Sequence, residues 1–220
     1  MHAARKFISA TSRLPQSSPR ALLSPLPHNP LLRLRVSRRC YSETINDPTR
    51  TDLHYHLQHP PTPLSNSAPA FALTFLPSAP PSATSSTVVG WLPATSEVEA
   101  EAGLNDFKEN PGFRTLLHEV ISEALKQGVD DVQTNAALQM GSGWMHIHDE
   151  RNVPALGRIG DPDDIIASVL VDEGKIQPET YQAMPAYRLC TADGPTQLTP
   201  GLARRLVEAL ETRASQEKTS

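Results

Sequence analysis

Acidic side chains are missing from the first 41 residues of this chain, and the first one is Glu43. The same stretch holds eight Lys and Arg residues and is rich in Ser and Pro. A basic, Ser-rich segment without acids is typical of a mitochondrial presequence. Pro and Arg interrupt every apolar run that could form the core of a secretory signal peptide, which argues against secretion. The composition therefore predicts import into mitochondria, with a disordered basic arm that binds nucleic acid or anionic lipid as the alternative.

Residues 2–14 have the pattern of the amphipathic helix that import receptors bind. The apolar face of this predicted helix repeats at i, i+4, i+7 and i+11, and it consists of Ala3, Phe7, Ala10 and Leu14. Further along, Arg39 precedes an aromatic and a small residue, Tyr41 and Ser42, as in sites of the matrix processing peptidase. We expect cleavage near Tyr41, which makes residues 1–41 the presequence.

Cysteine is scarce as well. The chain has only Cys40 and Cys190, and removal of the presequence leaves Cys190 alone. A single cysteine excludes an internal disulfide and a set of thiolates for zinc or an iron–sulfur cluster. Cys190 lies in an apolar segment without an adjacent base, which predicts a buried and unreactive thiol.

Positive charge becomes scarce once the presequence is removed. The whole chain has 20 Lys and Arg and 24 Asp and Glu, and the presequence takes eight of the former and none of the latter. The 179 residues that follow therefore carry a formal net charge of −12. Phosphate backbones bind to protein cations, so this charge disfavours nucleic acid as a direct partner and favours a basic protein.

Charge of either sign is absent from Leu53 to Ser96, a stretch of 44 residues that eight prolines interrupt. Crossing a bilayer takes about 20 continuous apolar residues, so we expect no transmembrane segment. Residues 42–69 show neither helical nor strand periodicity, and we expect them to form an extended Pro/His-rich arm. The uncharged stretch would lie against another protein or, alternatively, would belong in part to the core of this one.

Two strands are predicted at residues 70–75 and 87–92, on either side of a low-complexity loop, and they suggest a hairpin. The clearest helix follows them. Asn110 is its expected N-cap, Pro111 its first residue and Gly128 its end. Its apolar residues recur at i, i+3, i+4, i+7 and i+8, so this helix must pack on a sheet or on a second helix.

Further strands are predicted in the second half of the chain. Side chains alternate over residues 144–148, with Met145 and Ile147 on one face. Residues 165–171 fit either a helix or a strand, and their β-branched side chains favour the strand. A turn at residues 192–194 predicts another hairpin.

A last amphipathic helix is predicted from Pro200 onward, with Thr199 as its cap. Beyond it, the polar tail at residues 213–220 is expected to fray. These elements predict an α+β fold, with a small antiparallel sheet packed by two amphipathic helices in a single domain over residues 70–212.

The strongest chemical signal is the histidine pair on the predicted strand. His146 and His148 are two residues apart, so they share a face and could bind one metal ion, with Asp149 as a third ligand or as a base. No histidine follows residue 148, however, and the ligands that hydrolases of this kind place downstream are missing. The alternative interpretation is a half-exposed strand that contacts a partner.

A contact surface is the interpretation that we favour for this region. The segment that follows the strand has little periodicity, but its charges, Pro and Gly are placed for a fixed loop. The predicted contact residues are Trp144, His146, His148, Arg151 and Arg158.

The sequence contains no complete set of catalytic residues and no motif that requires a cofactor. We therefore expect a soluble accessory protein of the mitochondrial matrix, or of the matrix face of the inner membrane. It would act by protein–protein contact as a subunit or assembly factor of a larger complex. The alternatives are a small metal-dependent hydrolase that uses the pair His146 and His148, and a ribosome-associated protein that docks on protein.

Overall fold

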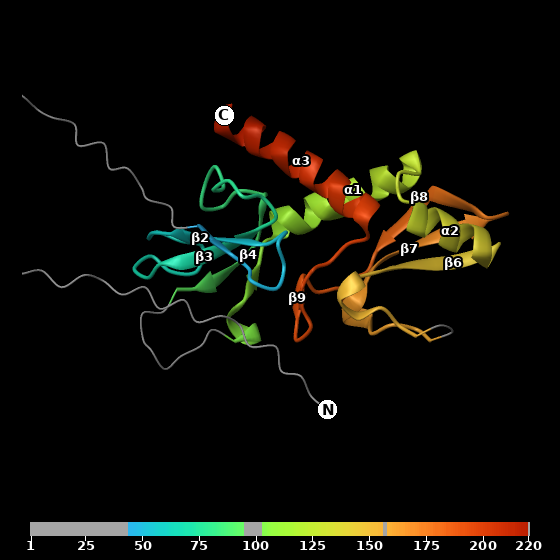
Figure 1. Cartoon of the computed structure of the whole chain (residues 1–220), viewed down its shortest axis with the longest axis horizontal. Helices are drawn as coiled ribbons and strands as arrows, with labels where there is room; N and C mark the ends of the chain where they lie inside the picture. The colour runs from blue at the N-terminus through green and yellow to red at the C-terminus, as the bar shows by residue number, and fades with distance from the viewer. Residues whose placement is uncertain (1–43, 95–102, 156–157, 220) are drawn as a thin grey trace, which may run out of the picture.

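The computed structural model describes residues 44–94, 103–155 and 158–219 of the chain. The predicted presequence, including the expected cleavage site at Arg39, Tyr41 and Ser42, lies outside these residues. The described residues form an α+β fold with antiparallel sheets, which confirms the predicted fold class (Figure 1). The α-helices of this part of the chain are α1 (Pro111–Gln127), α2 (Asp131–Met140) and α3 (Pro200–Thr219).

The first sheet has five strands in the order β1-β2-β3-β4-β5, each antiparallel to its neighbour. The pairing of β3 with β4 confirms the predicted hairpin, and β5 forms a short edge strand beside β4. These strands are β1 (Thr44–Asn46), β2 (His54–Gln58), β3 (Ala70–Thr74), β4 (Val88–Pro93) and β5 (Lys108–Glu109).

Strands β1 and β2 correct the expectation of an extended arm over residues 42–69. The ring of His56 is buried in this sheet, where its Nε2 atom lies 3.1 Å from the carbonyl oxygen of Leu76. Leu53 is fully buried in the core. The sequence lacks the periodicity of a buried strand here because β1 has only three residues and the buried side chain of β2 is the polar His56. Part of the uncharged stretch therefore lies in the core of the protein itself.

The second sheet has three antiparallel strands in the order β6-β7-β8. The strand that the sequence favoured at residues 165–171 is β7, and Glu173 and Gly174 adopt positive φ angles in the turn that follows it. A small hairpin of two short strands lies after this sheet, at the predicted turn. These strands are β6 (Gly143–His148), β7 (Ile165–Asp172), β8 (Lys175–Ala183), β9 (Cys190–Thr191) and β10 (Gly194–Pro195).

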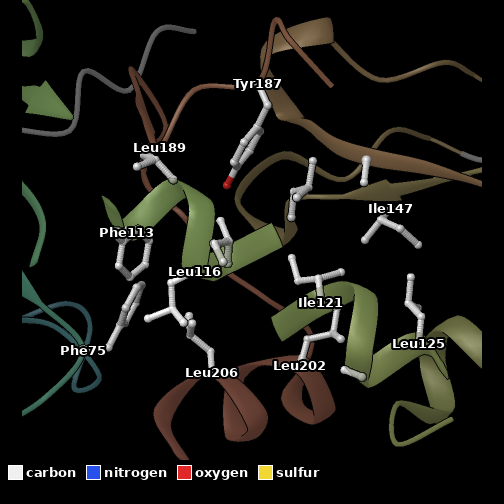
Figure 2. Close-up of a cluster of buried hydrophobic side chains, with 14 of the residues drawn as sticks. Phe75, Phe113, Leu116, Ile121, Leu125, Ile147, Tyr187, Leu189, Leu202 and Leu206 are labelled. Carbon is white, nitrogen blue, oxygen red and sulfur yellow. The ribbon is translucent and has the colours of Figure 1, made fainter. Parts of the chain in front are cut away.

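Helix α1 holds the two sheets together. It begins as predicted, because the Asn110 side chain accepts a hydrogen bond from the backbone N–H of Gly112, and it ends at Gly128 with a φ of 62°. One core cluster joins α1 to both sheets and to α3. Figure 2 shows this continuity, from the stacked rings of Phe75 and Phe113 at one end to Ile147 at the other.

A single buried carboxylate caps two helices. Asp130 accepts a hydrogen bond from the backbone N–H of Gln133, in the first turn of α2, and another from Leu202, in the first turn of α3. The hydroxyl of Thr199, the predicted cap of the last helix, donates to the same carboxylate over 2.7 Å. Helix α2 has no apolar stripe and was not predicted, although its N-cap Asp130 and the glycine that ends it, Gly141, are the usual signals.

Helix α3 corrects the expectation of a frayed tail from residue 213. The helix continues to Thr219, with Ala214 buried in the core. Near its end, Glu217 accepts a hydrogen bond of 2.6 Å from the hydroxyl of Ser86, in the loop before β4. These contacts hold a polar segment that has little apolar periodicity of its own.

Candidate functional site

Strand β6 directs its side chains alternately into the core and away from it, as predicted. Met145 and Ile147 are buried in the core cluster that includes α1 and Ala137 of α2. The opposite side of the β6–β7–β8 sheet, here called the outer face, is the side that carries Trp144, which is 50% exposed. His146 from β6 and Ser168 and Leu170 from β7 lie on this face at matching register positions. His148 follows a register shift that pairs it with Ile165, and its ring remains next to that of His146.

His146 is held by its cross-strand neighbour. Its Nδ1 atom lies 2.8 Å from the hydroxyl oxygen of Ser168, and that hydroxyl donates to the sulfur of Met184 over 3.5 Å. With the proton on Nδ1, His146 donates to Ser168 and keeps Nε2 as a free acceptor. The ring of His148 stands edge-on to the ring of His146, with 6.1 Å between their centroids. The two imidazoles are therefore close and ordered.

His148 lies at the border of the outer face. Its Nδ1 atom is buried and has no hydrogen-bond partner within the described part of the chain. Gly160 packs against this atom so closely that a Cβ at that position would lie 2.9 Å from it. Burial lowers the pKa of His148, and the neighbouring His146 adds to this effect, while Asp164 opposes it. The neutral ring is therefore the favoured form at neutral pH.

The next residue, Asp149, belongs to the interior. Its carboxylate is fully buried and accepts hydrogen bonds from the backbone N–H groups of Arg151 and Gln197 and from the hydroxyl of Tyr187. Burial raises the pKa of Asp149, and the charge of Arg151 and these hydrogen bonds oppose that shift. Asp149 is thus not turned toward the histidine pair, where the metal-site hypothesis would place it.

Arg151 lies in the same buried network rather than on a contact surface. Only 1% of its side chain is exposed, and its Nε atom donates to Asp164 over 2.7 Å. Its other nitrogens donate to the backbone carbonyl groups of Asp163, Arg188 and Gly194. We therefore remove Arg151 from the predicted contact residues, because a partner cannot reach it.

Tyr187 closes this network from the other side. Its buried hydroxyl lies 2.8 Å from both Asp149 and the hydroxyl of Thr196. The guanidinium groups of Arg151 and Arg114 lie 5.6 and 5.9 Å from the centre of its ring. Burial raises the pKa of Tyr187 well above its ordinary value, and Asp149 adds to this effect. The network therefore ties the end of β6 to the β9–β10 hairpin and to α1.

The loop that follows the network is exposed. Arg158 lies there, and its backbone N–H donates to the carbonyl oxygen of Ala155 over 2.9 Å. Two apolar side chains of the same loop, Val153 and Ile159, are exposed to solvent, the latter to 82%. Of the predicted contact residues, Trp144, His146 and His148 thus share one face, and Arg158 is exposed in the loop beyond.

Metal binding at this site is limited by the number of ligands that the described residues provide. Within the described residues, no group of three or more His, Cys, Asp or Glu side chains is placed to hold a metal ion. Two imidazoles, His146 and His148, are available on the outer face, while Asp149 is engaged in the interior. Cys190 is buried as predicted, and burial raises the pKa of its thiol to about 11, so the reactive thiolate is disfavoured.

The sequence did not reveal the residues that hold the side chains of Asp149 and Arg151 in the interior. Asp164 stands in an acidic run that is typical of a helix start, and it ends a single turn of 3-10 helix, Pro162–Asp164, directly before β7. Tyr187 and Thr196 carry no local signal, because they reach the network only through the folded chain. Ser168 could have been found, since it lies opposite His146 when the two strands are paired.

Comparison with known proteins adds no functional information. Neither a protein-family model nor a curated protein nor a solved structure matches this chain. In the ranges 44–94, 103–155 and 158–219, no helix is both long and apolar enough to span a membrane. The function is therefore inferred from the residues of this chain alone.

Proposed function

We propose that this protein is a mitochondrial accessory protein that acts by contact, as a subunit or assembly factor of a larger complex. The observation that carries the proposal is the outer face, where half-exposed Trp144 stands beside the ordered pair His146 and His148. Tryptophan is enriched among the residues that dominate protein–protein interfaces, since its large ring buries much area on binding. A protein partner that covers Trp144 fits this arrangement.

The proposed location has separate support in the sequence. The acid-free basic segment at residues 1–41 fits a presequence, and the rest of the chain has a formal net charge of −12. A strongly acidic chain attracts a basic protein surface and repels phosphate backbones. We therefore place the protein in the matrix or at the matrix face of the inner membrane, in contact with protein rather than with nucleic acid.

The experiment that tests this function is fractionation of mitochondria that carry a C-terminally tagged copy. Native gels would separate the complexes, and mass spectrometry would identify the proteins that migrate with the tag. We expect stable migration in a particle much larger than the chain, with a constant set of partners. Migration as a monomer or small oligomer would contradict the proposal.

One observation keeps a metal-dependent hydrolase as the second candidate. The hydrogen bond between His146 Nδ1 and Ser168 orients the ring and leaves Nε2 free, as in histidines that bind metals. Its test is metal analysis of the purified protein beside a His146→Ala variant. Stoichiometric metal that the variant loses would favour this candidate, whereas metal-free wild-type protein with full partner binding would reject it.

A further inference from the structure

Within the described residues, strand β6 lies at the border of its sheet, with β7 on one side and no strand on the other (Figure 1). Trp144 of β6 pairs with Leu170 of β7, and the backbone N–H of Leu170 donates to the hydroxyl of Thr180 in β8 over 2.8 Å. Leu170 thus directs its backbone groups away from β6, and in an antiparallel pair the opposite residue does the same. Trp144 and, two residues on, His146 therefore direct their N–H and C=O groups to the open edge.

The other edges of the two larger sheets have features that discourage pairing with a further strand. Strand β1 has three residues and β5 has two, so both are very short. Strand β8 is longer, but its edge carries Lys175, Pro178 and Glu179. Strand β6 has six residues without a charge or a proline, and its register with β7 is regular from Gly143 to Ile147. Of the edges in the described part of the chain, β6 is therefore the most suited to accept a strand.

We propose that β6 pairs with β6 of a second copy of this protein, antiparallel and about a two-fold axis at Met145. This axis places Trp144 opposite His146 of the second copy, and these are the two residues with outward backbone groups. Each such pair exchanges two N–H···O=C hydrogen bonds, so the arrangement satisfies both residues in both copies. The two three-stranded sheets then form one continuous sheet.

The side chains of β6 favour a second copy as the added strand. Trp144 is 50% exposed in a single copy, and the pairing puts its ring beside the imidazole of His146 from the other copy. Aromatic pairs of this kind across neighbouring strands stabilise a sheet. Strand β6 carries no formal charge with neutral histidines, so two identical strands place no like charges opposite each other. A two-fold interface uses one surface twice, so the match between Trp144 and His146 within one strand is sufficient.

This inference goes beyond the proposed function, because it concerns the backbone edge of β6 and its test needs no other protein. The two-fold axis is perpendicular to the sheet, so both copies turn the outer face to the same side and leave it open to a further partner. A dimer that enters no larger particle would overturn the proposed function alone. A single copy inside a large particle would overturn this inference alone.

The test is sedimentation velocity of the protein purified from mitochondria, over a series of concentrations. We expect the wild type to sediment as two copies at the higher concentrations. His146→Pro removes the outward N–H and leaves the β6–β7 hydrogen bonds intact, because the N–H of residue 146 does not take part in them. His146→Thr is the matched control, since it loses the imidazole and keeps the N–H. We expect dimer affinity to fall at least about thirtyfold in the first variant, which loses one backbone bond per copy, and less than about fivefold in the second.

A pair of cysteines tests the register without removing any backbone group. In Trp144→Cys with His146→Cys, residue 144 of one copy has its Cα about 5.5 Å from that of residue 146 of the other, a distance that a disulfide spans. Lys175→Cys with Glu179→Cys is the control at the opposite edge of the sheet. Cys190 is buried, so mild oxidation and non-reducing gels report on the introduced thiols. We expect linked dimers from the first pair only.

Circular dichroism shows whether each variant is folded, and the cysteine pair decides if His146→Pro is not. Three results would each overturn the inference. They are a wild type that sediments as one copy at every concentration, equal affinity of folded His146→Pro and His146→Thr, and absence of linked dimers from the pair at residues 144 and 146.

Discussion

His148 and Asp149 are neighbours in the chain but lie in opposite environments. Up to His148, the polar residues of β6 occupy the outer face beside Trp144. From Asp149 to Arg151, the chain turns inward, and both side chains are buried among fixed hydrogen-bond partners. A cluster of polar residues in sequence is therefore not one site. The chain changes direction at the end of β6. This divides the cluster of polar residues into a surface for contact and an interior network that stabilises the fold.

The two regions should respond differently to mutation. Removing one member of a buried ion pair leaves the other charge without compensation in a medium of low dielectric constant. Removing an exposed side chain exposes nothing new and loses little packing. The comparison therefore predicts large losses of stability on one side of residue 148 and small ones on the other.

The largest effect is expected for Arg151→Met, which keeps much of the side-chain volume and removes the charge. Asp149 and Asp164 would then be buried without their cation, at a cost of about 3–5 kcal/mol in the free energy of unfolding. Urea unfolding at neutral pH measures this loss. Arg188→Met is the control, because Arg188 is exposed and lies 4.0 Å from Asp163, so we expect a change below about 1 kcal/mol. Equal losses in both variants would remove the distinction.

A smaller effect is expected for Tyr187→Phe, which keeps the ring and deletes the hydroxyl. Asp149 and Thr196 each lose a buried hydrogen-bond partner, at a cost of about 1–3 kcal/mol. Tyr181→Phe is the matched control, because its hydroxyl lies 2.9 Å from Nδ1 of His118, which is partly exposed. If Tyr181→Phe loses as much stability as Tyr187→Phe, the buried hydrogen bonds of Tyr187 contribute no more to stability than an ordinary tyrosine hydroxyl.

The border residue His148 should make stability depend on pH. Its folded pKa lies below the ordinary value of 6.5, so the unfolded chain binds a proton more readily than the folded one. Its contribution is therefore complete above about pH 6.5 and is lost as the pH falls toward the folded pKa. Urea midpoints at pH 7.5 and 5.5 should show this loss in the wild type.

The matched variant for this titration is His148→Gln, which should lose less stability than the wild type over the same pH interval. His56 and His118 also have pKa values that burial lowers, so part of the pH dependence should persist in the variant. An identical pH dependence in both proteins would show that His148 has the same pKa folded and unfolded, contrary to its position against Gly160.

The smallest effect on stability is expected for Trp144→Ser. Half of this side chain is already exposed, so we expect a loss below about 1 kcal/mol, well under that of Arg151→Met. Thermal unfolding followed by circular dichroism suffices as the measurement. A loss of several kcal/mol would show that Trp144 stabilises the fold, as Arg151 does, and would weaken its proposed role in contact with a partner.

Local signals were enough to predict most of the regular elements. The caps Asn110 and Gly128 marked α1, and alternation marked β3 and β6, because each of these patterns lies in neighbouring residues. Strands β1 and β2 were missed because β1 has only three residues and β2 buries the polar His56 instead of an apolar side chain. Helix α2 was missed because it buries little apolar surface, with only Gln133 and Ala137 inside.

The sequence predicts one part of the candidate site, the shared face of the strand, but not the buried network beside it. The shared face of Trp144, His146 and His148 follows from the two-residue period of a strand, which the sequence shows directly. The burial of Arg151 does not follow from any local pattern, because Asp164 and Tyr187 approach it only in the folded protein. Charged residues after a strand look like a surface loop until these tertiary partners are known.

The most direct test of the central claim is native-gel migration of the Trp144→Ser protein in mitochondria. Val132→Ser is the matched control, because Val132 is also 50% exposed but lies on α2. We predict that the Trp144 variant is folded and yet shifts from the large particle to the position of the free chain, while the Val132 variant remains in the particle. Full retention of the Trp144 variant in the particle would contradict the assignment of the outer face as the contact surface.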